Sequence, residues 1–320
     1  MRSYLLMRAV FAVVTVIAAT FIVFTVSRLT GDPREMLIRP EGYGISEEAY
    51  EAIGKKLGLD KPLVVQYGIW LGRVVRGDFG KTLLTQRPVI DLFLEKAPAT
   101  IKLSIASWIL ATLIGVPLGV LSAVYRGGFI DYVGRTFALF GQATPAFWLG
   151  IMVILIFSVL LNWLPSGTIG PDDATFIERA KYFVLPSIVL GWGGAAGYLR
   201  LTRSAMLEVL DSEFIRLARA KGVSNSRVVW KHAFRNALIP PLTFSALLMA
   251  FFLNGQVVIE VVFSWPGLGR LATESVFEND FNTLSTAVLF FAALFSLTAF
   301  IADVLYATID PRIRLTGHKE

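Results

Sequence analysis

The sequence contains no cysteine. Disulfide bonds, thiolate metal sites and cysteine nucleophiles are therefore excluded for these 320 residues. Histidine is nearly as scarce, because only His232 and His318 occur, and both lie among lysines and arginines rather than beside carboxylates. The sequence therefore lacks most of the residues from which a histidine–carboxylate metal site or catalytic triad is built. We expect a chain with no catalytic residues and no metal site.

Charge is also scarce. Only 17% of the residues are charged and 55% are hydrophobic, which gives a mean hydropathy of +0.62. A water-covered domain is far more polar, so the composition predicts lipid as the main solvent. In so apolar a chain, the formal net charge of +6 is more typical of basic cytoplasmic loops than of nucleic-acid binding. We expect membrane lipid, and no nucleic acid, as a partner.

The apolar residues gather in six uncharged stretches of 18 to 26 residues. Each stretch is long enough for a helix to cross a hydrocarbon core of ~30 Å. The first stretch exceeds the apolar part of a signal peptide, so we expect it to remain as a span. The sequence predicts an all-α, polytopic membrane protein with six transmembrane helices, at Ala9–Val26, Leu103–Tyr125, Thr136–Leu161, Tyr182–Leu199, Asn236–Ile259 and Phe281–Ala302.

The middle of every span lacks lysine, arginine, aspartate, glutamate and histidine. Lys102, Glu260 and Asp303 stand at span ends, where we expect their side chains to reach the lipid headgroups. Ion-coupled carriers, channels with charged filters and intramembrane enzymes use ionisable groups at depth. Their absence argues against the alternative function, an ion-coupled secondary transporter or a channel without an ATPase partner. It favours a transporter that a partner protein energises.

Basic residues in the short loops predict the orientation. Fifteen lie on one side of the six stretches and three on the other, which places both termini in the cytoplasm. The long segment Gly31–Pro98 is left out of this comparison, because long loops cross the membrane largely regardless of charge. We expect it to form an external insertion with one helix from Ser46 to Gly58 and another over Leu63–Val75. The alternating charges of these helices predict a solvated face.

Several residues within the spans have two interpretations. Asn254 and Gln256 would either line a substrate path or form hydrogen bonds between helices. Gly193 and Gly197 have the spacing that lets two helices approach closely. The prolines predict kinked helices around a cavity, although proline is common in membrane helices in general; they are Pro117, Pro145, Pro186, Pro240 and Pro241.

The longest cytoplasmic connection is Leu201–Arg235. Its centre predicts an amphipathic helix that starts near Asp211 and stops at Gly222. Ala218 and Ala220 should form a small ridge between charged residues. Such a ridge suits a groove on a cytoplasmic protein better than insertion into the inner leaflet, which is the alternative for a basic amphipathic helix.

The stretch Arg216-Leu-Ala-Arg-Ala-Lys-Gly222, with its continuation to Pro240, resembles the EAA loop of permease subunits of binding-protein-dependent ATP-binding cassette (ABC) importers. The likeness is to the dipeptide, oligopeptide and nickel group. Arg216 and Leu217 stand where the wider superfamily has Glu and Ala, as is usual in the peptide group. Further segments match in order and spacing: Gly31–Pro33, Gly77–Gly80, Ala99–Thr100, Pro145–Gly150, Trp163–Gly167, Phe263–Arg270 and Asp310–Arg314.

The resemblance implies a type I ABC importer permease fold. Such a subunit moves peptides, or nickel, oligosaccharides or similar small solutes, across the cytoplasmic membrane of a bacterium or archaeon. Its partners would be a second homologous permease subunit, two cytoplasmic ABC ATPase subunits and an external solute-binding protein. ATP and Mg²⁺ would bind to the ATPases, and no cofactor to this chain.

The resemblance also implies a division of the chain. Residues 1–98 would form the first transmembrane helix and the external helical insertion that marks the first permease of the peptide pair. Residues 99–310 would form a five-helix permease core with the cytoplasmic coupling loop 201–235, and residues 311–320 a cytoplasmic tail.

Three groups of candidate site residues follow. The ATPase-coupling residues would be Asp211, Glu213, Arg216, Ala218, Arg219, Ala220, Lys221 and Gly222. The substrate path would include Asn254 and Gln256. The loop that faces the binding protein would contain Trp265, Pro266, Gly267, Gly269 and Arg270, with its two glycines in a tight turn.

The predicted topology places Ser224 in the cytoplasm. Because the chain has no cysteine, a single Ser224→Cys substitution provides a unique labelling site. We expect a membrane-impermeant thiol reagent to label it only after the membrane is opened. Labelling of intact cells from outside would contradict the topology.

Overall fold

The structure is a computed structural model, which describes residues 2–30, 34, 50–52, 54–55, 58–83, 85–171, 173–254 and 256–309. The helix expected from Ser46 falls largely outside these residues, as do Gly31–Pro33, Asp310–Arg314 and the tail 311–320. The described part is helical without a β-strand, and its only strand-like pairing is an isolated bridge between Lys81 and Pro88. The predicted all-α class is confirmed.

Four helices are long and apolar enough to cross a membrane by themselves: α1 (Arg2–Thr30), α5 (Val89–Val124), α8 (Phe176–Leu210) and α15 (Phe281–Ile309). Two further candidate spans in the described chain are bent. The first joins α6 (Phe129–Ala143) to α7 (Ala146–Val153) and the π-helix η1 (Ile154–Leu160). The second consists of α10 (Asn225–Arg227), the π-helix η2 (Val228–Ala233), α11 (Phe234–Ala237) and α12 (Ile239–Leu253). The count is six if each bent pair is one span.

The third apolar stretch, expected as one helix over Thr136–Leu161, is instead bent by 106°. The break lies at Thr144, which has extended backbone angles, and Pro145, which precedes α7. A proline disfavours helical angles at the residue before it, which agrees with the extended angles of Thr144. Pro117 and Pro186, in contrast, lie inside continuous helices.

The helix in the fifth apolar stretch is shorter than the span expected over Asn236–Ile259. This helix, α12, ends at Leu253, with Pro240 and Pro241 in its first turn, where a missing N–H costs little. A short helix, α13 (Val257–Val262), follows, and α14 (Leu268–Phe277) leads into α15.

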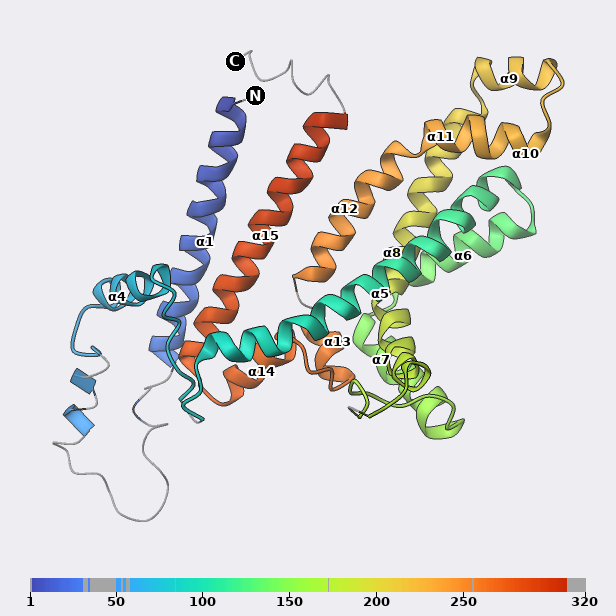
Figure 1. Ribbon diagram of the computed structural model, residues 1–320. Coiled ribbons are helices and arrows are strands. Elements are labelled where there is room, and N and C mark those ends of the chain that lie inside the picture. Colours follow the sequence, from blue (N-terminus) through green and yellow to red (C-terminus); the bar gives the residue numbers. More distant parts are fainter. Residues whose placement is uncertain are drawn as a thin grey trace.

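Helices α5 and α8 form the most extensive helix pair of the described structure. Glycines bring the two backbones together: a Cβ on Gly115 would overlap the backbone of Ala195, and a Cβ on Gly119 would lie 2.7 Å from Cβ of Thr202. Close packing of this kind drives helix association in lipid, where water does not contribute. The pair forms the centre of the molecule (Figure 1).

The predicted close approach at Gly193 and Gly197 is found at only one of the two. A Cβ on Gly197 would lie 2.5 Å from the ring of Phe244 in α12, whereas a Cβ on Gly193 would meet only the carbonyl oxygen of Gly141 at 3.6 Å. Gly197 is therefore a packing residue, and Gly193 has space beside it.

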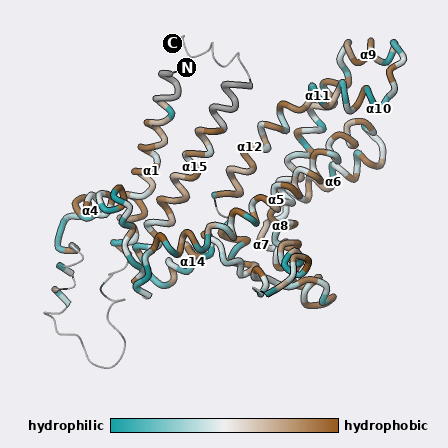
Figure 2. Tube along the Cα trace, viewed as in Figure 1, coloured by the Kyte–Doolittle hydropathy of each residue, from teal (hydrophilic) through white to brown (hydrophobic). Residues whose placement is uncertain are grey.

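Helices α1 and α15 run side by side, apart from the α5–α8 pair (Figure 1). Apolar residues occur along the length of both helices (Figure 2). The start of α1, the end of α15 and the short helix α9 (Glu213–Ala220) lie on one side of the molecule, with α13 and α14 toward the other (Figure 1).

We predict that Gly115→Ala destabilises the protein by about 1–3 kcal/mol, because the added methyl group must displace the backbone of α8. Gly193→Ala is the matched control, since the same methyl group fits there without displacement. Thermal unfolding in detergent measures both. Equal melting temperatures for the two variants would contradict the packing described above.

Candidate functional site

The predicted amphipathic helix of the cytoplasmic loop is α9, at the outer tip of the molecule (Figure 1). Gly222 follows it with a φ of +75°, a conformation that glycine adopts without strain. The N–H of Gly222 donates to the carbonyl of Arg219 at 2.9 Å, and that of Val223 to the carbonyl of Ala218 at 3.2 Å. These two bonds form a Schellman motif, so the predicted stop at Gly222 is confirmed.

One side chain anchors α9 to the rest of the protein. Ile215 is fully buried in an apolar cluster with Val120 of α5, Met206 of α8 and Val228 of η2. The ion pair between Arg126 and Asp211 spans 3.7 Å but is largely exposed, and such pairs contribute little. The sequence analysis did not identify Ile215 as a buried anchor. Its apolar side chain in an otherwise charged segment was the available signal.

The exposed face of α9 differs from the expected one. Ala218 packs partly against the buried cluster, so Ala218 and Ala220 do not form an exposed ridge. The exposed apolar side chains are Phe214 and Leu217, with 46% and 56% of their surface accessible. Exposed charged residues surround them, namely Asp211, Glu213, Arg216, Arg219 and Lys221.

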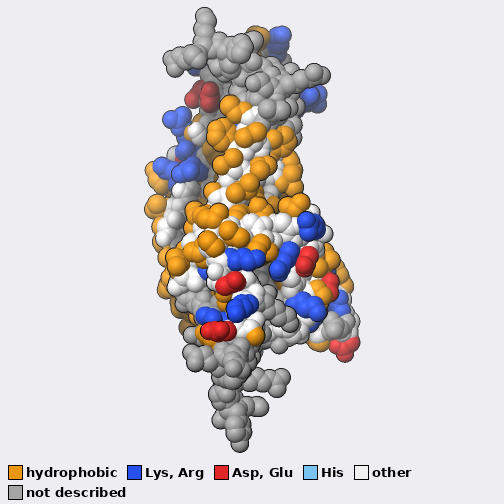
Figure 3. Space-filling view, turned by 90° about the vertical axis from the view of Figure 1, so that its left-hand side faces the viewer, with side chains coloured by type: hydrophobic (Ala, Val, Ile, Leu, Met, Phe, Trp, Pro, Cys, Tyr) orange, Lys and Arg blue, Asp and Glu red, His pale blue; other side chains and the backbone are white. Residues whose placement is uncertain are grey.

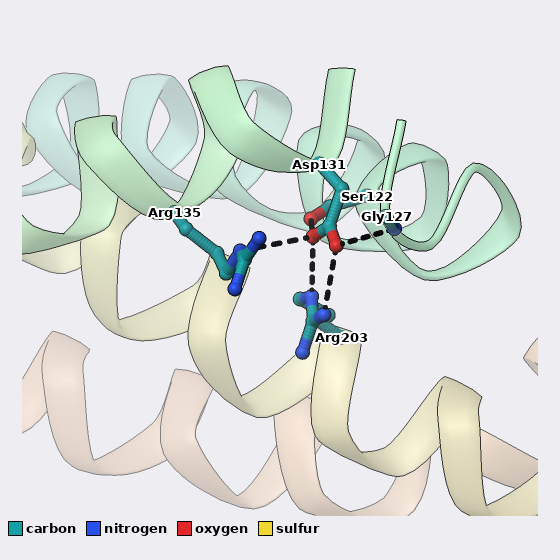
Figure 4. A network of polar contacts seen from close by, with 5 residues as sticks. All are labelled: Ser122, Gly127, Asp131, Arg135 and Arg203. Atoms are coloured by element: carbon teal, nitrogen blue, oxygen red, sulfur yellow. Dashed lines mark hydrogen bonds and ion pairs between the residues drawn. The ribbon is translucent and has the colours of Figure 1, made fainter. Parts of the chain in front are cut away.

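A buried carboxylate ties the helices below α9 together (Figure 4). Asp131, in the first turn of α6, is 1% exposed, and Arg203 of α8 binds both of its oxygens, at 2.7 and 3.0 Å. Ser122 Oγ donates to the same carboxylate at 2.6 Å, and the N–H of Gly127 donates at 2.9 Å. We call this set the Asp131 clamp, because it fixes the turn between α5 and α6 to α8.

The sequence gives only a weak signal for the Asp131 clamp. Asp131 follows a short loop, and Arg203 lies 72 positions further on. Arg203 contributed only as one of the basic residues that indicate the cytoplasmic side. An aspartate next to a tight turn in so apolar a chain was the available clue.

A second buried carboxylate lies at the opposite end of α5. Glu260, in α13 and outside the candidate spans, is 1% exposed. It accepts hydrogen bonds from Thr100 Oγ1 at 2.7 Å and from the N–H of Arg270 at 3.0 Å. Thr100 Oγ1 also accepts from the N–H of Leu268 at 2.8 Å. Together these groups bind N–H groups of the first turn of α14 that no helical carbonyl can reach.

Glu260 therefore does not extend to the lipid headgroups as expected. Burial raises its pKa above the usual glutamate value, while the hydrogen bonds from Thr100 and from the N–H groups of Arg270 and Gly269 oppose this rise. The carboxylate is a structural link between Thr100, in the first third of α5, and the start of α14.

The two glycines of the neighbouring loop make room for this carboxylate. A Cβ on Gly267 would overlap the Glu260 side chain, and a Cβ on Gly269 would lie 2.8 Å from Cα of Val257. Gly267 has an extended φ of −102°, so space rather than backbone freedom requires glycine there.

The loop residues expected to face an external protein are mostly internal. Trp265 is fully buried, and its Nε1 donates to the carbonyl of Ala99 at 3.0 Å. Gly267 and Gly269 are also buried, and Pro266 is half-buried. Arg270 is partly exposed and is held by Glu274 at 2.7 Å and by the carbonyl of Ser264 at 2.8 Å.

The structure places Asn254 and Gln256 in the wall of a cavity of about 670 Å³. Its other walls come from α6, α7, α8, α12 and α15, and they are mainly apolar. The Asn254 amide donates to the carbonyl of Ala250 at 2.7 Å, and the Gln256 amide to that of Phe251 at 3.3 Å. Asn254 Oδ1 has no hydrogen-bond partner among the described residues. A cavity of this size accommodates a small organic solute.

The described residues contain no cluster of three or more histidine, aspartate or glutamate side chains that could hold a metal ion. The buried carboxylates Asp131, Glu260 and Asp280 each have protein donors around them and act in packing.

Comparison with known proteins gives a family for the whole chain. The family model described as "Binding-protein-dependent transport system inner membrane component" matches residues 115–315, and its N-terminal counterpart matches residues 1–104. The oligopeptide transport system permease protein AppB of Bacillus subtilis is 39% identical over 318 residues, covering 98% of this chain and 99% of the relative. The glutathione transport system permease protein GsiC of Escherichia coli K12 is 38% identical over 315 residues, with 98% and 99% coverage.

Among solved structures, the chain is similar to one of the inward-facing MetNI methionine ABC transporter. The TM-score is 0.56 at 20% identity, with 70% of this chain and 98% of that chain covered. This similarity concerns the fold.

The fold and the matched segments define a multi-pass helical subunit of the type I ABC importer class. The chain belongs to the family of inner membrane components of binding-protein-dependent transport systems. It is a permease subunit rather than an enzyme, and ATP hydrolysis belongs to its ATPase partners. Subunits of this family have no cofactor of their own and work with a second permease and with ATPases.

We predict that Asp131→Ala destabilises the protein by about 3 kcal/mol, because it leaves the mostly buried Arg203 guanidinium without its partner. Arg135→Ala is the control: Arg135 lies 3.7 Å from the same carboxylate, is half-exposed, and should contribute ~0–1 kcal/mol. Thermal unfolding of the purified variants measures both effects. Equal melting temperatures for Asp131→Ala and Arg135→Ala would contradict the role given to the Asp131 clamp.

Proposed function

We propose that this chain is one of two permease subunits of an importer for peptides or small peptide-like solutes. The relatives named for oligopeptide and glutathione transport support a peptide solute. The cavity supports it as well, since its apolar walls suit side chains and the Asn254 and Gln256 amides suit peptide groups. Nickel and oligosaccharides are the other solutes of the group, and mass spectrometry of ligand retained by the cognate binding protein distinguishes them.

The proposed assembly contains this chain, a second homologous permease subunit, two cytoplasmic ATPase subunits that bind ATP and Mg²⁺, and an external solute-binding protein. It lies in the cytoplasmic membrane of a bacterium or archaeon, with both termini of this chain in the cytoplasm. Two observations support this orientation: the excess of basic residues in one set of loops, and the position of α9 on the same side as the start of α1.

The observation that carries the proposal is the structure of α9, which has one buried anchor and an exposed apolar pair. Phe214 and Leu217 would fit a groove on an ATPase subunit, as apolar residues of an amphipathic helix do. The charged residues around them would set the orientation of docking, and Gly222 would fix the end of the helix. The coupling set of Asp211, Glu213, Arg216, Ala218, Arg219, Ala220, Lys221 and Gly222 thus gains Phe214 and Leu217 as its main contacts.

Movement of α9 would reach the cavity through packed helices. Ile215 connects α9 to the ends of α5 and α8, and the Asp131 clamp connects α6 to α8. These helices would shift together, as rigid elements do in transport cycles. Because α6 and α8 also form walls of the cavity, their shift would change its access.

The external end of the subunit would respond to the same movement. Glu260 and Thr100 join the start of α5 to α14, so a shift of α5 would move the loop that contains Pro266 and Arg270. Of the loop residues, the partly exposed Arg270 is the best candidate for contact with the binding protein. Trp265, Gly267 and Gly269 would hold the shape of the loop from inside.

Within the proposed domain division, residues 99–310 form the permease core with the coupling loop 201–235. Residues 1–98 add the first span and the external insertion. The separation of α1 from the α5–α8 pair supports a division between the first span and the core (Figure 1). The expected boundary at residue 98 lies inside α5, which begins at Val89, so the first ten residues of α5 belong with the core.

Copurification tests the docking role. We predict that the double variant Phe214→Asp and Leu217→Asp inserts into the membrane but loses most of its ATPase subunits during purification, and with them solute uptake. Phe277→Asp is the control, because Phe277 is 81% exposed at the opposite end of the molecule. Full retention of the ATPases by the double variant would exclude this face of α9 as their docking site.

A further inference from the structure

The helix α4 (Leu63–Val75), in the segment between α1 and α5, has apolar residues on two opposite faces. One face packs on α1, where Tyr67 and Trp70 lie against Phe24. The other face is exposed and carries Val64, Val65, Gly68, Ile69, Gly72 and Val75. Val64 and Val75 are 67% and 80% exposed. The exposed face of this helix is therefore mainly apolar, rather than charged as the sequence led us to expect.

The depth of α4 follows from its contacts with α1. Tyr67 Oη lies 2.8 Å from Thr20 Oγ1 and donates to the carbonyl of Ile17 at 3.2 Å. Both contacts fall inside the apolar stretch of α1, which continues to Val26. At 1.5 Å per residue, Thr20 is about 9 Å before the end of that stretch. Helix α4 thus contacts α1 within its apolar stretch rather than beyond the end of that stretch.

The direction of α4 and the charged residues near it are those expected of a helix that lies at the boundary between membrane and water. It runs across α1 rather than along it, above the lower end of α1 (Figure 1). Seen from the side of α1 and α4, apolar side chains cover the middle of the molecule, and below them lysine, arginine, aspartate and glutamate gather in a band (Figure 3). Arg73 and Arg76, at the end of α4, are exposed and carry the positive charge that lipid phosphates attract.

We propose that α4 is an interfacial helix that lies in the outer leaflet of the membrane. Val64, Val65, Ile69 and Val75 contact acyl chains, and Arg73 and Arg76 contact lipid phosphate groups. Amphipathic helices of this type lie about 5–10 Å deep at the boundary of headgroups and acyl chains, which agrees with the level of Thr20. The helix holds the start of the external segment on the membrane surface and fixes the depth of α1 through Tyr67 and Trp70.

The partner is the phospholipid bilayer, because the exposed face of α4 continues the exposed apolar surface of α1. Met7, Phe11, Val14 and Ile22 of α1 are all largely exposed, as are Val64 and Val75 of α4. Water or another protein could cover this face instead. Water would leave the apolar side chains unburied, and a protein would exclude lipid from them. The experiment separates these two alternatives from lipid.

The absence of cysteine allows single spin labels at chosen positions. The variants Val64→Cys and Val75→Cys are labelled in the assembled transporter after reconstitution into phospholipid vesicles. Relaxation by oxygen, which concentrates in lipid, is compared with relaxation by a water-soluble nickel chelate. Val14→Cys on α1 is the lipid control and Lys61→Cys, before α4, is the water control.

We expect the ratio of oxygen to nickel accessibility at Val64 and Val75 to match that at Val14 and to exceed that at Lys61 clearly. A ratio equal to that at Lys61 means that α4 lies in water, and it overturns the proposal. Low accessibility to both reagents means that protein covers the face, and it overturns the proposal as well. Neither result depends on the identity of the solute or on the docking of α9.

Discussion

The close packing of α5 on α8 is the interaction on which the rest of the structure depends. Gly115 and Gly119 let the backbones touch, and in lipid such contact is the main source of helix association. Because α5 reaches both ends of the molecule, one end of the pair holds Ile215 and the coupling helix α9. The other end holds Thr100, Glu260 and the start of α14. The cavity lies beside the pair, along α8.

Two buried carboxylates fix the ends of this pair, and each does so with partners that satisfy its charge. Asp131 has an arginine, a serine and a backbone N–H around it, so its burial does not leave an unpaired ion. Glu260 has backbone donors at a helix start and the hydroxyl of Thr100. Neither carboxylate faces the cavity. Their positions are consistent with a subunit whose energy comes from a partner, since the described walls of the cavity contain no ionisable side chain.

Hydropathy alone was sufficient to predict the class and the positions of the apolar stretches, because lipid demands long uncharged helices. Periodicity and one glycine were sufficient for α9. A kink was expected at Pro117, Pro145 and Pro186 alike, but of these three only Pro145 lies at a break, so the sequence did not show which proline would interrupt its helix. The role of Glu260 was hidden because its partner Thr100 lies 160 positions away. The exposed face of α9 was predicted wrongly because the burial of Ile215, which the sequence did not show, determines which side of the helix points outward.

The most direct test of the coupling role of α9 is transport by Gly222→Val in reconstituted vesicles, measured together with ATP hydrolysis. Valine is strained at the φ of +75°, so the helix stop should fail although the space around it is free. Gly77→Val is the matched control, since Gly77 has a φ of +83° and equally free surroundings on the other side of the molecule. The account predicts normal membrane insertion and loss of uptake for Gly222→Val, with uptake retained by Gly77→Val. Normal uptake by Gly222→Val would contradict it.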